Sequence, residues 1–259
     1  MPAAYLLTAF AVTALAGWAL RPVAAQVGLL DHPGGRKTHA VPTPLVGGLG
    51  IFIGVVFTTI WLPEALLAYG PFLSLSALVL FIGTIDDLKQ LRATTRMTGQ
   101  SLVALVMAVV AGVQLHSLGN AFGSELLLGW LGIPFTVFAT VGVINAINMS
   151  DGIDGLSGGL SAIALAFIAA LALAGGQGLH ASFVALIVFA LLAFLLLNFR
   201  RPWGRSALIY LGDGGSTMLG FMLAWLLIDA SQGEGALFAP VHALWFLAVP
   251  LLDTVNLLI

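Results

Sequence analysis

The chain has 259 residues, of which 60% are hydrophobic and only 8% are charged, whereas a soluble domain carries charge at about a quarter of its positions. This composition excludes a mainly water-facing surface, and the net charge of -2 excludes the cationic surface of a nucleic-acid-binding protein. The absence of cysteine excludes disulfide bonds and thiolate metal sites.

Apolar segments of nearly membrane-spanning length recur along the chain. A helix needs about 20 mainly apolar residues to cross the hydrocarbon. The segments that approach this length are 3–20, 45–62, 71–85, 98–115, 127–148, 156–174, 181–198, 208–228 and 239–259. The first has no basic region before it and no cleavage pattern after it, so we interpret it as a retained span. The pattern predicts an all-α fold, a bundle of about nine spanning helices that forms a single membrane domain over residues 1–259.

Lys and Arg residues occur only in alternate loops between these segments. They are Arg21, Arg36, Lys37, Lys89, Arg92, Arg96, Arg200, Arg201 and Arg205. Cationic residues concentrate in the cytoplasmic loops of membrane proteins. We therefore predict that these loops are cytoplasmic and that the N-terminus lies outside.

Acidic residues gather at the predicted cytoplasmic ends of three segments. They are Asp86 and Asp87 at the end of the third, Asp151 and Asp154 after the fifth, and Asp213 at the start of the eighth. Acidic groups at a membrane are costly and are functional candidates. Like charges that lie close together need a cation to offset them. Oxygen ligands without cysteine favour Mg²⁺, with Mn²⁺ as the alternative, so the pattern predicts a divalent-metal site.

Basic and glycine-containing runs lie on the same predicted side. Asp31 is followed by Arg36, Lys37 and His39, and cationic groups beside a metal neutralise phosphoryl substrates. The run Asp213-Gly-Gly-Ser at a helix start offers free backbone N–H groups to an anion. Together these features predict phosphate chemistry at the membrane surface.

Each cluster also has a simpler structural interpretation. An Asp-Asp pair can end a helix at the interface, and the other aspartates can cap helices. The basic residues alone can serve membrane topology. We favour the functional interpretation because three Asp-containing clusters converge on one predicted side. Residues interpreted as structural are His116, His180 and His242, with Trp61, Trp130, Trp203, Trp225 and Trp245 as an interfacial belt.

Five runs of polar residues and glycine follow one another along nearly the whole chain. They are Asp31-His-Pro-Gly-Gly-Arg-Lys-Thr-His39, Pro42-x-Pro44-x-x-Gly47-Gly48, Asp86-Asp87, Asn145-x-x-Asn148-x-x-Asp151-Gly-x-Asp154-Gly155 and Gly212-Asp213-x-Gly215-Ser216. In this order they resemble the motifs of the polyprenyl-phosphate N-acetylhexosamine-1-phosphate transferases. The Arg-Lys-x-His run is more similar to the branch that uses UDP-GlcNAc.

The resemblance implies an enzyme that transfers GlcNAc-1-phosphate from UDP-GlcNAc, a UDP-N-acetylhexosamine, to undecaprenyl phosphate, with release of UMP and a requirement for Mg²⁺. It implies a multi-pass protein of the bacterial cytoplasmic (inner) membrane, surrounded by membrane lipids, with its active site facing the cytoplasm. The product would enter cell-envelope glycan synthesis, for cell wall or lipopolysaccharide. A homodimer is compatible with this expectation.

The resemblance also assigns roles to individual residues. The metal would be held by Asp213 and Asn148. The catalytic residues would be Asp86 and Asp87, which position or deprotonate the lipid phosphate, and Asp151 and Asp154, whose loop holds the nucleotide. The substrate-binding residues would be Arg36, Lys37, His39, Asn145, Asn148 and Tyr210, of which Tyr210 stands where an aromatic ring can stack on uracil.

One departure and several alternatives stay open at this point. Family members continue into a basic loop with a His-x-His-His motif, whereas this chain stops at Ile259, so we expect a fragment or a short form of the enzyme. An ion-coupled transporter is an alternative, although its carboxylates would lie near the bilayer midplane. Others are a phospho-N-acetylmuramoyl-pentapeptide-type transferase and a non-catalytic scaffold that binds the lipid carrier. A CDP-alcohol phosphotransferase is disfavoured, because Asp151-Gly is followed by Ile-Asp.

Overall fold

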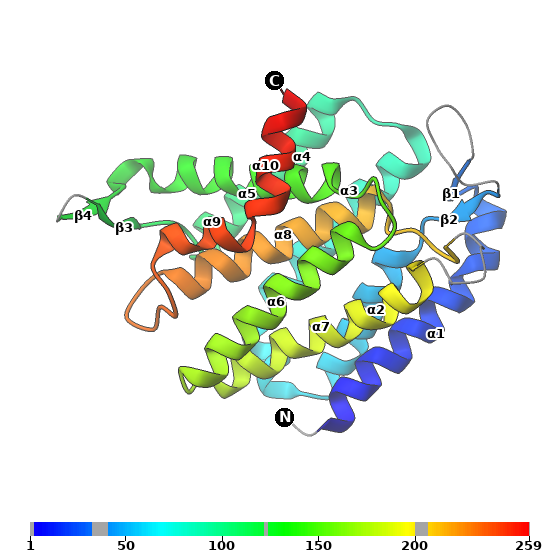
Figure 1. Ribbon diagram of the computed structural model, residues 1–259, viewed down its shortest axis with the longest axis horizontal. Coiled ribbons are helices and arrows are strands. Elements are labelled where there is room, and N and C mark those ends of the chain that lie inside the picture. Colours follow the sequence, from blue (N-terminus) through cyan, green and yellow to red (C-terminus); the bar gives the residue numbers. More distant parts are fainter. Residues whose placement is uncertain (1–2, 33–40, 122–123, 200–206, 259) are drawn as a thin grey trace.

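The computed structural model describes residues 3–32, 41–121, 124–199 and 207–258 of the chain (Figure 1). Its helices are α1 (Ala3–Val27), α2 (Gly47–Ile60), α3 (Pro63–Lys89), α4 (Ala93–Val109), α5 (Gly132–Met149), α6 (Leu156–Ala174), α7 (Gly178–Asn198), α8 (Gly212–Ser231), α9 (Ala243–Phe246) and α10 (Ala248–Leu258). Single 3-10 turns are η1 (Gly129–Leu131) and η2 (Pro240–His242). The fold is mainly helical, as predicted.

Two small antiparallel hairpins occur in the connections between helices, where the sequence predicted no strands. Strand β1 (Leu30–Asp31) pairs with β2 (Thr43–Pro44), and β3 (Ser117–Ala121) pairs with β4 (Ser124–Leu127). Both pairs are short, so they leave the bundle all-helical. The hairpin of β1 and β2 joins α1 to α2.

Six helices within the described ranges are long and apolar enough to cross a membrane. They are α1, α3, α5 with the turn before it, α6, α7 and α8. Helix α2 is apolar but has 14 residues, and α4 has 17. At a rise of about 1.5 Å per residue, each of these two is shorter than a full hydrocarbon crossing of about 30 Å.

Some helix limits differ from the predicted ones. Helix α6 has the predicted limits, but α3 begins at Pro63 and not near residue 71, because proline is favoured in the first turn of a helix. The predicted segment 239–259 is not one helix, since α9 ends at Phe246 and α10 begins at Ala248. In a continuous helix the ring of Pro250 would clash with the carbonyl group of Phe246.

Helix α8 is the centre of the bundle. Every residue of α8 is buried except Asp213 and Asp229. It packs against α2, α3, α5 and α6, and Figure 1 shows it running through the middle of the molecule. A helix that is apolar on all sides has to be surrounded by other helices. Its two partly exposed positions are therefore the aspartates near its opposite ends.

Glycine lets α8 approach two neighbours closely at its first turn. A Cβ atom at Gly83 of α3 would lie 2.5 Å from Cα of Gly214. A Cβ atom at Gly48 of α2 would lie 2.2 Å from Cα of Gly215. A side chain at either crossing would force the backbones apart. The first turn of α8 is thus held between α2 and α3.

Successive helices run in opposite directions and bring their polar ends together. The C-terminal ends of α3 and α5 reach the start of α8 through hydrogen bonds of Asp87 and Asn148. Helix α7 ends at Asn198 on the same side. The starts of α2 and α4 also lie on this side, where Gly47 binds Tyr210 and Arg96 binds Asp86. We call this side of the bundle the polar end.

An aromatic cluster joins α3, α7 and α8 at the opposite end. Tyr69 stacks on Phe183 with ring centroids 3.8 Å apart, and its hydroxyl oxygen is 2.9 Å from Nδ1 of His180. Phe72 packs edge-on against Trp225. The contact with Tyr69 agrees with a structural role for His180. The assignment of Trp225 to the interfacial belt was wrong, because α8 is central and this side chain is buried.

The crossing of α3 and α8 can be tested by enlarging Gly83. We expect Gly83→Ala to lower the melting temperature in detergent, because the added methyl group meets the backbone of Gly214 and overpacking costs about 1–3 kcal/mol. Gly142→Ala in α5 is the matched control, since nothing lies within 4 Å of its added Cβ. Equal melting temperatures for both variants would contradict the tight crossing.

Candidate active site

The candidate site begins at the first turn of α8, where Asp213 meets the end of α5. The Oδ1 atom of Asp213 accepts a hydrogen bond of 2.8 Å from Nδ2 of Asn148. The same Nδ2 is 2.9 Å from Oγ of Ser216, which lies one turn along α8. The two residues expected to hold a metal are therefore in direct contact. Ser216 orients the amide of Asn148, a role that the motif alone does not indicate.

The two acids at the end of α3 have different partners. The carboxylate of Asp87 accepts backbone N–H groups of Asp213 at 2.8 Å and of Gly214 at 3.0 Å. Asp86 is buried and accepts a charged hydrogen bond of 2.8 Å from Nη1 of Arg96. A backbone N–H in the connection to α4 also binds Asp86, at 2.7 Å. These contacts satisfy a buried carboxylate that would otherwise be costly.

The loop between α5 and α6 adds Asp151 and Asp154 to the polar end. Burial raises the pKa of the Asp151 carboxyl group well above its usual range, and the charges of Asp213, Asp87 and Asp154 raise it further. Like charges act in this way only when they are close together. The acidic clusters from three separate parts of the sequence therefore converge, as the sequence predicted.

Asn198, the last residue of α7, holds this loop in place through two hydrogen bonds. Its Oδ1 atom accepts a hydrogen bond of 2.6 Å from the N–H group of Gly155. Its Nδ2 atom donates one of 3.0 Å to the carbonyl group of Ile209. The side chain is buried and uses both polar atoms. It connects the acidic loop to the segment that leads into α8. A single Asn at a helix end belongs to no motif, so the sequence analysis did not predict this role.

The segment before α8 is held by the Pro-x-x-Gly-Gly run. The N–H group of Tyr210 donates to the carbonyl of Pro44 at 2.8 Å, and its own carbonyl accepts from the N–H of Gly47 at 2.9 Å. The ring of Tyr210 is half-buried. This backbone pairing places strand β2 beside Tyr210. The predicted substrate-binding residues Arg36, Lys37 and His39 lie outside the described residues, between β1 and β2.

Asn145 lies one turn before Asn148 on α5 and has a buried partner on α4. Its Nδ2 atom donates to Oε1 of Gln100 at 2.9 Å and to the carbonyl of Val141 at 2.8 Å. Gln100 is 1% exposed. It lies one turn after Arg96, so α4 contacts both the acids of α3 and the asparagines of α5. The sequence analysis did not single out Gln100, because this residue belongs to none of the motifs.

The chemistry of these residues fits Mg²⁺ shared with a phosphate substrate. Among the described residues, no group of three His, Cys, Asp or Glu side chains is arranged to ligate a metal alone. Mg²⁺ commonly binds through one or two carboxylates and takes its other ligands from water and substrate phosphates. Asp213 and Asn148 provide oxygen ligands of this kind. The surrounding acids supply a negative field that a divalent cation would offset.

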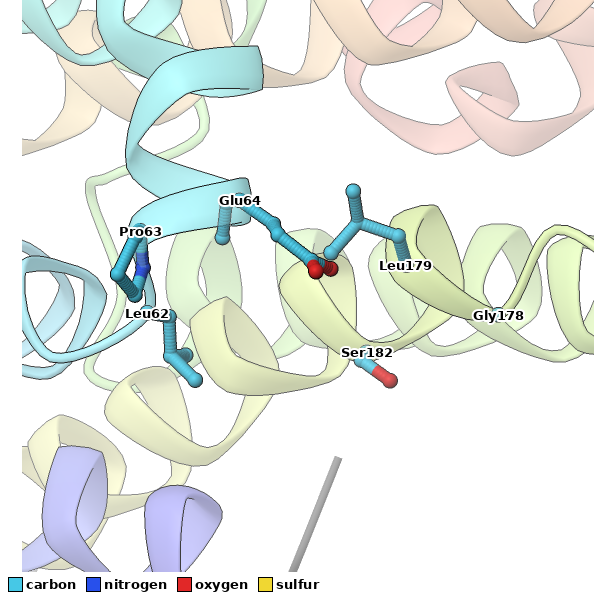
Figure 2. A pocket seen from close by; sticks show the side chains of 7 residues that line it. Leu62, Pro63, Glu64, Gly178, Leu179 and Ser182 are labelled. Carbon is cyan, nitrogen blue, oxygen red and sulfur yellow. The ribbon is translucent and has the colours of Figure 1, made fainter.

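A surface pocket of about 450 Å³ lies elsewhere and does not include these residues (Figure 2). Its lining comes from the starts of α3 and α7: Leu62, Pro63, Glu64, Ala65, Gly178, Leu179 and Ser182. In Figure 2 the side chain of Glu64 points toward Leu179. Both helix starts are at the end opposite the polar end, so this pocket is separate from the candidate active site.

The raised pKa of Asp151 predicts a pH-dependent stability. In the unfolded chain an Asp ionises near pH 4, whereas in the metal-free folded protein it ionises at a higher pH. Between these two pH values the unfolded chain loses the Asp151 proton more readily than the folded protein does, so the free energy of unfolding falls as the pH rises. Above the higher value this loss of stability is complete. We therefore expect Asp151→Asn to raise the melting temperature in EDTA more at pH 8 than at pH 5. Glu234→Gln, at an exposed position after α8, is the control, and an equal effect of Asp151→Asn at both pH values would contradict the prediction.

Comparison with known proteins identifies relatives over most of the chain. Residues 69–231 match glycosyl transferase family 4. An undecaprenyl-phosphate alpha-N-acetylglucosaminyl 1-phosphate transferase of Yersinia pestis is 38% identical over 239 residues, 92% of this chain and 65% of the relative. The protein of the same name from Escherichia coli O157:H7 is 39% identical over 98% of this chain and 69% of its own length. The Haemophilus influenzae protein of that name is 38% identical over 92% and 68%.

The chain spans about two thirds of the length of these curated relatives. The family match begins within the second turn of α3 and continues to the last residue of α8. It thus includes Asp86, Asp87, Asp151, Asp154 and Asp213. The chain belongs to glycosyl transferase family 4.

Proposed function

We propose that this chain transfers N-acetylglucosamine-1-phosphate from UDP-GlcNAc to undecaprenyl phosphate and releases UMP. The observation that carries the proposal is the contact of Asp213 with Asn148 and Asp87 at the start of a buried helix. The names of the relatives supply the reaction class, an undecaprenyl-phosphate acceptor and an N-acetylglucosaminyl 1-phosphate group.

The reaction exchanges one phosphoanhydride bond for another. An oxygen of the lipid phosphate attacks the phosphorus that carries the sugar, and the bond from this phosphorus to the oxygen bridging to UMP breaks. UMP leaves with that bridging oxygen. A phosphate monoester has its last pKa near 6, so the acceptor is largely ionised at neutral pH. Positioning and charge neutralisation then contribute more than removal of a proton.

Asp213 and Asn148 are the residues that would hold Mg²⁺. When bound, the ion supplies positive charge that offsets the charge of the diphosphate. Asp151 and Asp154 hold the nucleotide from the α5–α6 loop, which Asn198 keeps beside the segment before α8. Tyr210, on that segment, stacks on uracil. Arg36, Lys37 and His39 bind the diphosphate from the loop between β1 and β2, and Asn145 contributes from α5.

The polar end faces the cytoplasm in our proposal, in a bacterial inner membrane. The alternating directions of α2 to α8 place the ends of α3, α5 and α7 together with the starts of α4, α6 and α8 on one side. Arg96, a described basic residue, is at this end, as the preference for cytoplasmic cations requires. The N-terminus is then outside. Carboxylates at helix ends also weigh against an ion-coupled transporter, whose site lies near the midplane.

The proposed reaction predicts a metal-dependent release of UMP. The purified chain is incubated in detergent with undecaprenyl phosphate and UDP-GlcNAc, with and without Mg²⁺. We expect UMP only with Mg²⁺, and a loss on the order of 100-fold in Asp213→Asn, because the carboxylate that would hold the charge-neutralising ion is removed. Asp229→Asn is the matched control, since it changes the other aspartate of α8 at the opposite end. Equal rates for Asp213→Asn and the parent chain would contradict the assignment of Asp213.

A further inference from the structure

The first turn of α8 has no cap from its own sequence. The residue before the helix is Leu211, and no side chain of the capping position binds the first N–H groups. The first N–H groups of any helix lack partners within the helix. In this helix they also lie inside a bundle, where an unpaired polar group is costly. Their partner must come from another part of the chain.

Asp87 of α3 is this partner. Its two carboxylate oxygens accept the N–H groups of Asp213 and Gly214 at 2.8 and 3.0 Å. An anion at this position also interacts favourably with the positive end of the helix dipole. Asp87 therefore does for α8, from a different helix, what a capping Asp usually does within its own helix.

The backbone around this contact accommodates the carboxylate. Gly212 has a φ angle of +76°, and a Cβ atom there would lie 2.8 Å from Oδ2 of Asp87. Gly83 lies one turn before Asp87 on α3 and contacts the backbone of Gly214. Residues four apart share one face of a helix. The same face of α3 thus provides both the close approach and the capping acid.

We infer that Asp87 is a positioning residue that fixes the first turn of α8, and with it the direction of the Asp213 carboxylate, and that it does not act as a base toward the acceptor phosphate. Both of its oxygens bind N–H groups of the residues that they position. Asp86, by contrast, is bound to Arg96 and to the α3–α4 connection. The inference rests on the proposed function only in assigning a metal to Asp213.

The experiment compares Asp87→Ala and Asp87→Asn with the parent chain in two measurements that need no substrate. Amide hydrogen exchange of the peptide that contains residues 212–216 reports on the first turn of α8 in metal-free protein. Mn²⁺ binding, followed by electron paramagnetic resonance, reports on Asp213. Glu64→Ala is the control, since it removes an exposed acid at the other end of the same helix.

We expect faster exchange of the 212–216 peptide in Asp87→Ala and Mn²⁺ binding that is weaker by about 10–100-fold, the usual effect of losing a residue that orients a metal ligand. Asp87→Asn retains one acceptor oxygen and should lie between Asp87→Ala and the parent. It should also recover UMP release as the Mg²⁺ concentration is raised, whereas loss of a base would not be recovered. Glu64→Ala should behave as the parent does.

Unchanged exchange in both Asp87 variants would overturn the inference, and so would faster exchange with unchanged Mn²⁺ binding. If Asp87→Ala does not fold, Asp87→Asn alone decides by the same criteria. If the parent chain binds no Mn²⁺, the metal assignment of the proposed function fails, and the exchange result alone decides whether Asp87 fixes α8. Failure of the parent to release UMP affects neither measurement.

Discussion

The start of α8 places free backbone N–H groups and a carboxylate inside an otherwise apolar bundle. Water cannot satisfy the buried N–H groups there, so a neighbouring helix must do so. Asp87 of α3 binds the N–H groups, and Asn148 of α5 binds the carboxylate of Asp213. This requirement explains the glycine crossings, because Asp87 can reach the first turn only if α3 and α8 nearly touch. The site and the centre of the fold are therefore stabilised by the same contacts.

The polar end carries more negative than positive charge among its described residues. Arg96 is paired with Asp86, whereas the charges of Asp213, Asp87 and Asp154 all disfavour ionisation of Asp151. Mutual repulsion of carboxylates disfavours the ionised cluster unless positive charge arrives. A divalent cation meets this need, and the basic run beginning at Arg36 follows β1 in sequence. Such a site suits a substrate that is itself anionic and that brings its own metal ligands.

Helix α4 links the two halves of the site, although no motif marks it. Arg96 binds Asp86 of α3, and one turn later Gln100 binds Asn145 of α5. Residues four apart on a helix point to the same side, so α4 contacts both groups with one face. Asn198 performs a similar function for the α5–α6 loop. None of these side chains belongs to a motif, and only their partners in space reveal what they do.

The amino-acid sequence indicates the membrane character, most helix positions and the acids of the candidate site. Hydrophobic runs of spanning length have few other stable outcomes, and costly acids at the ends of such runs indicate function. It did not determine the break before α10 or the central position of α8 with Trp225 buried, because every apolar span looks alike until its neighbours are known. The different partners of Asp86 and Asp87 also become apparent only in the folded protein. The two residues are adjacent in the sequence, but successive side chains on a helix point about 100° apart, so one meets Arg96 and the other meets the start of α8.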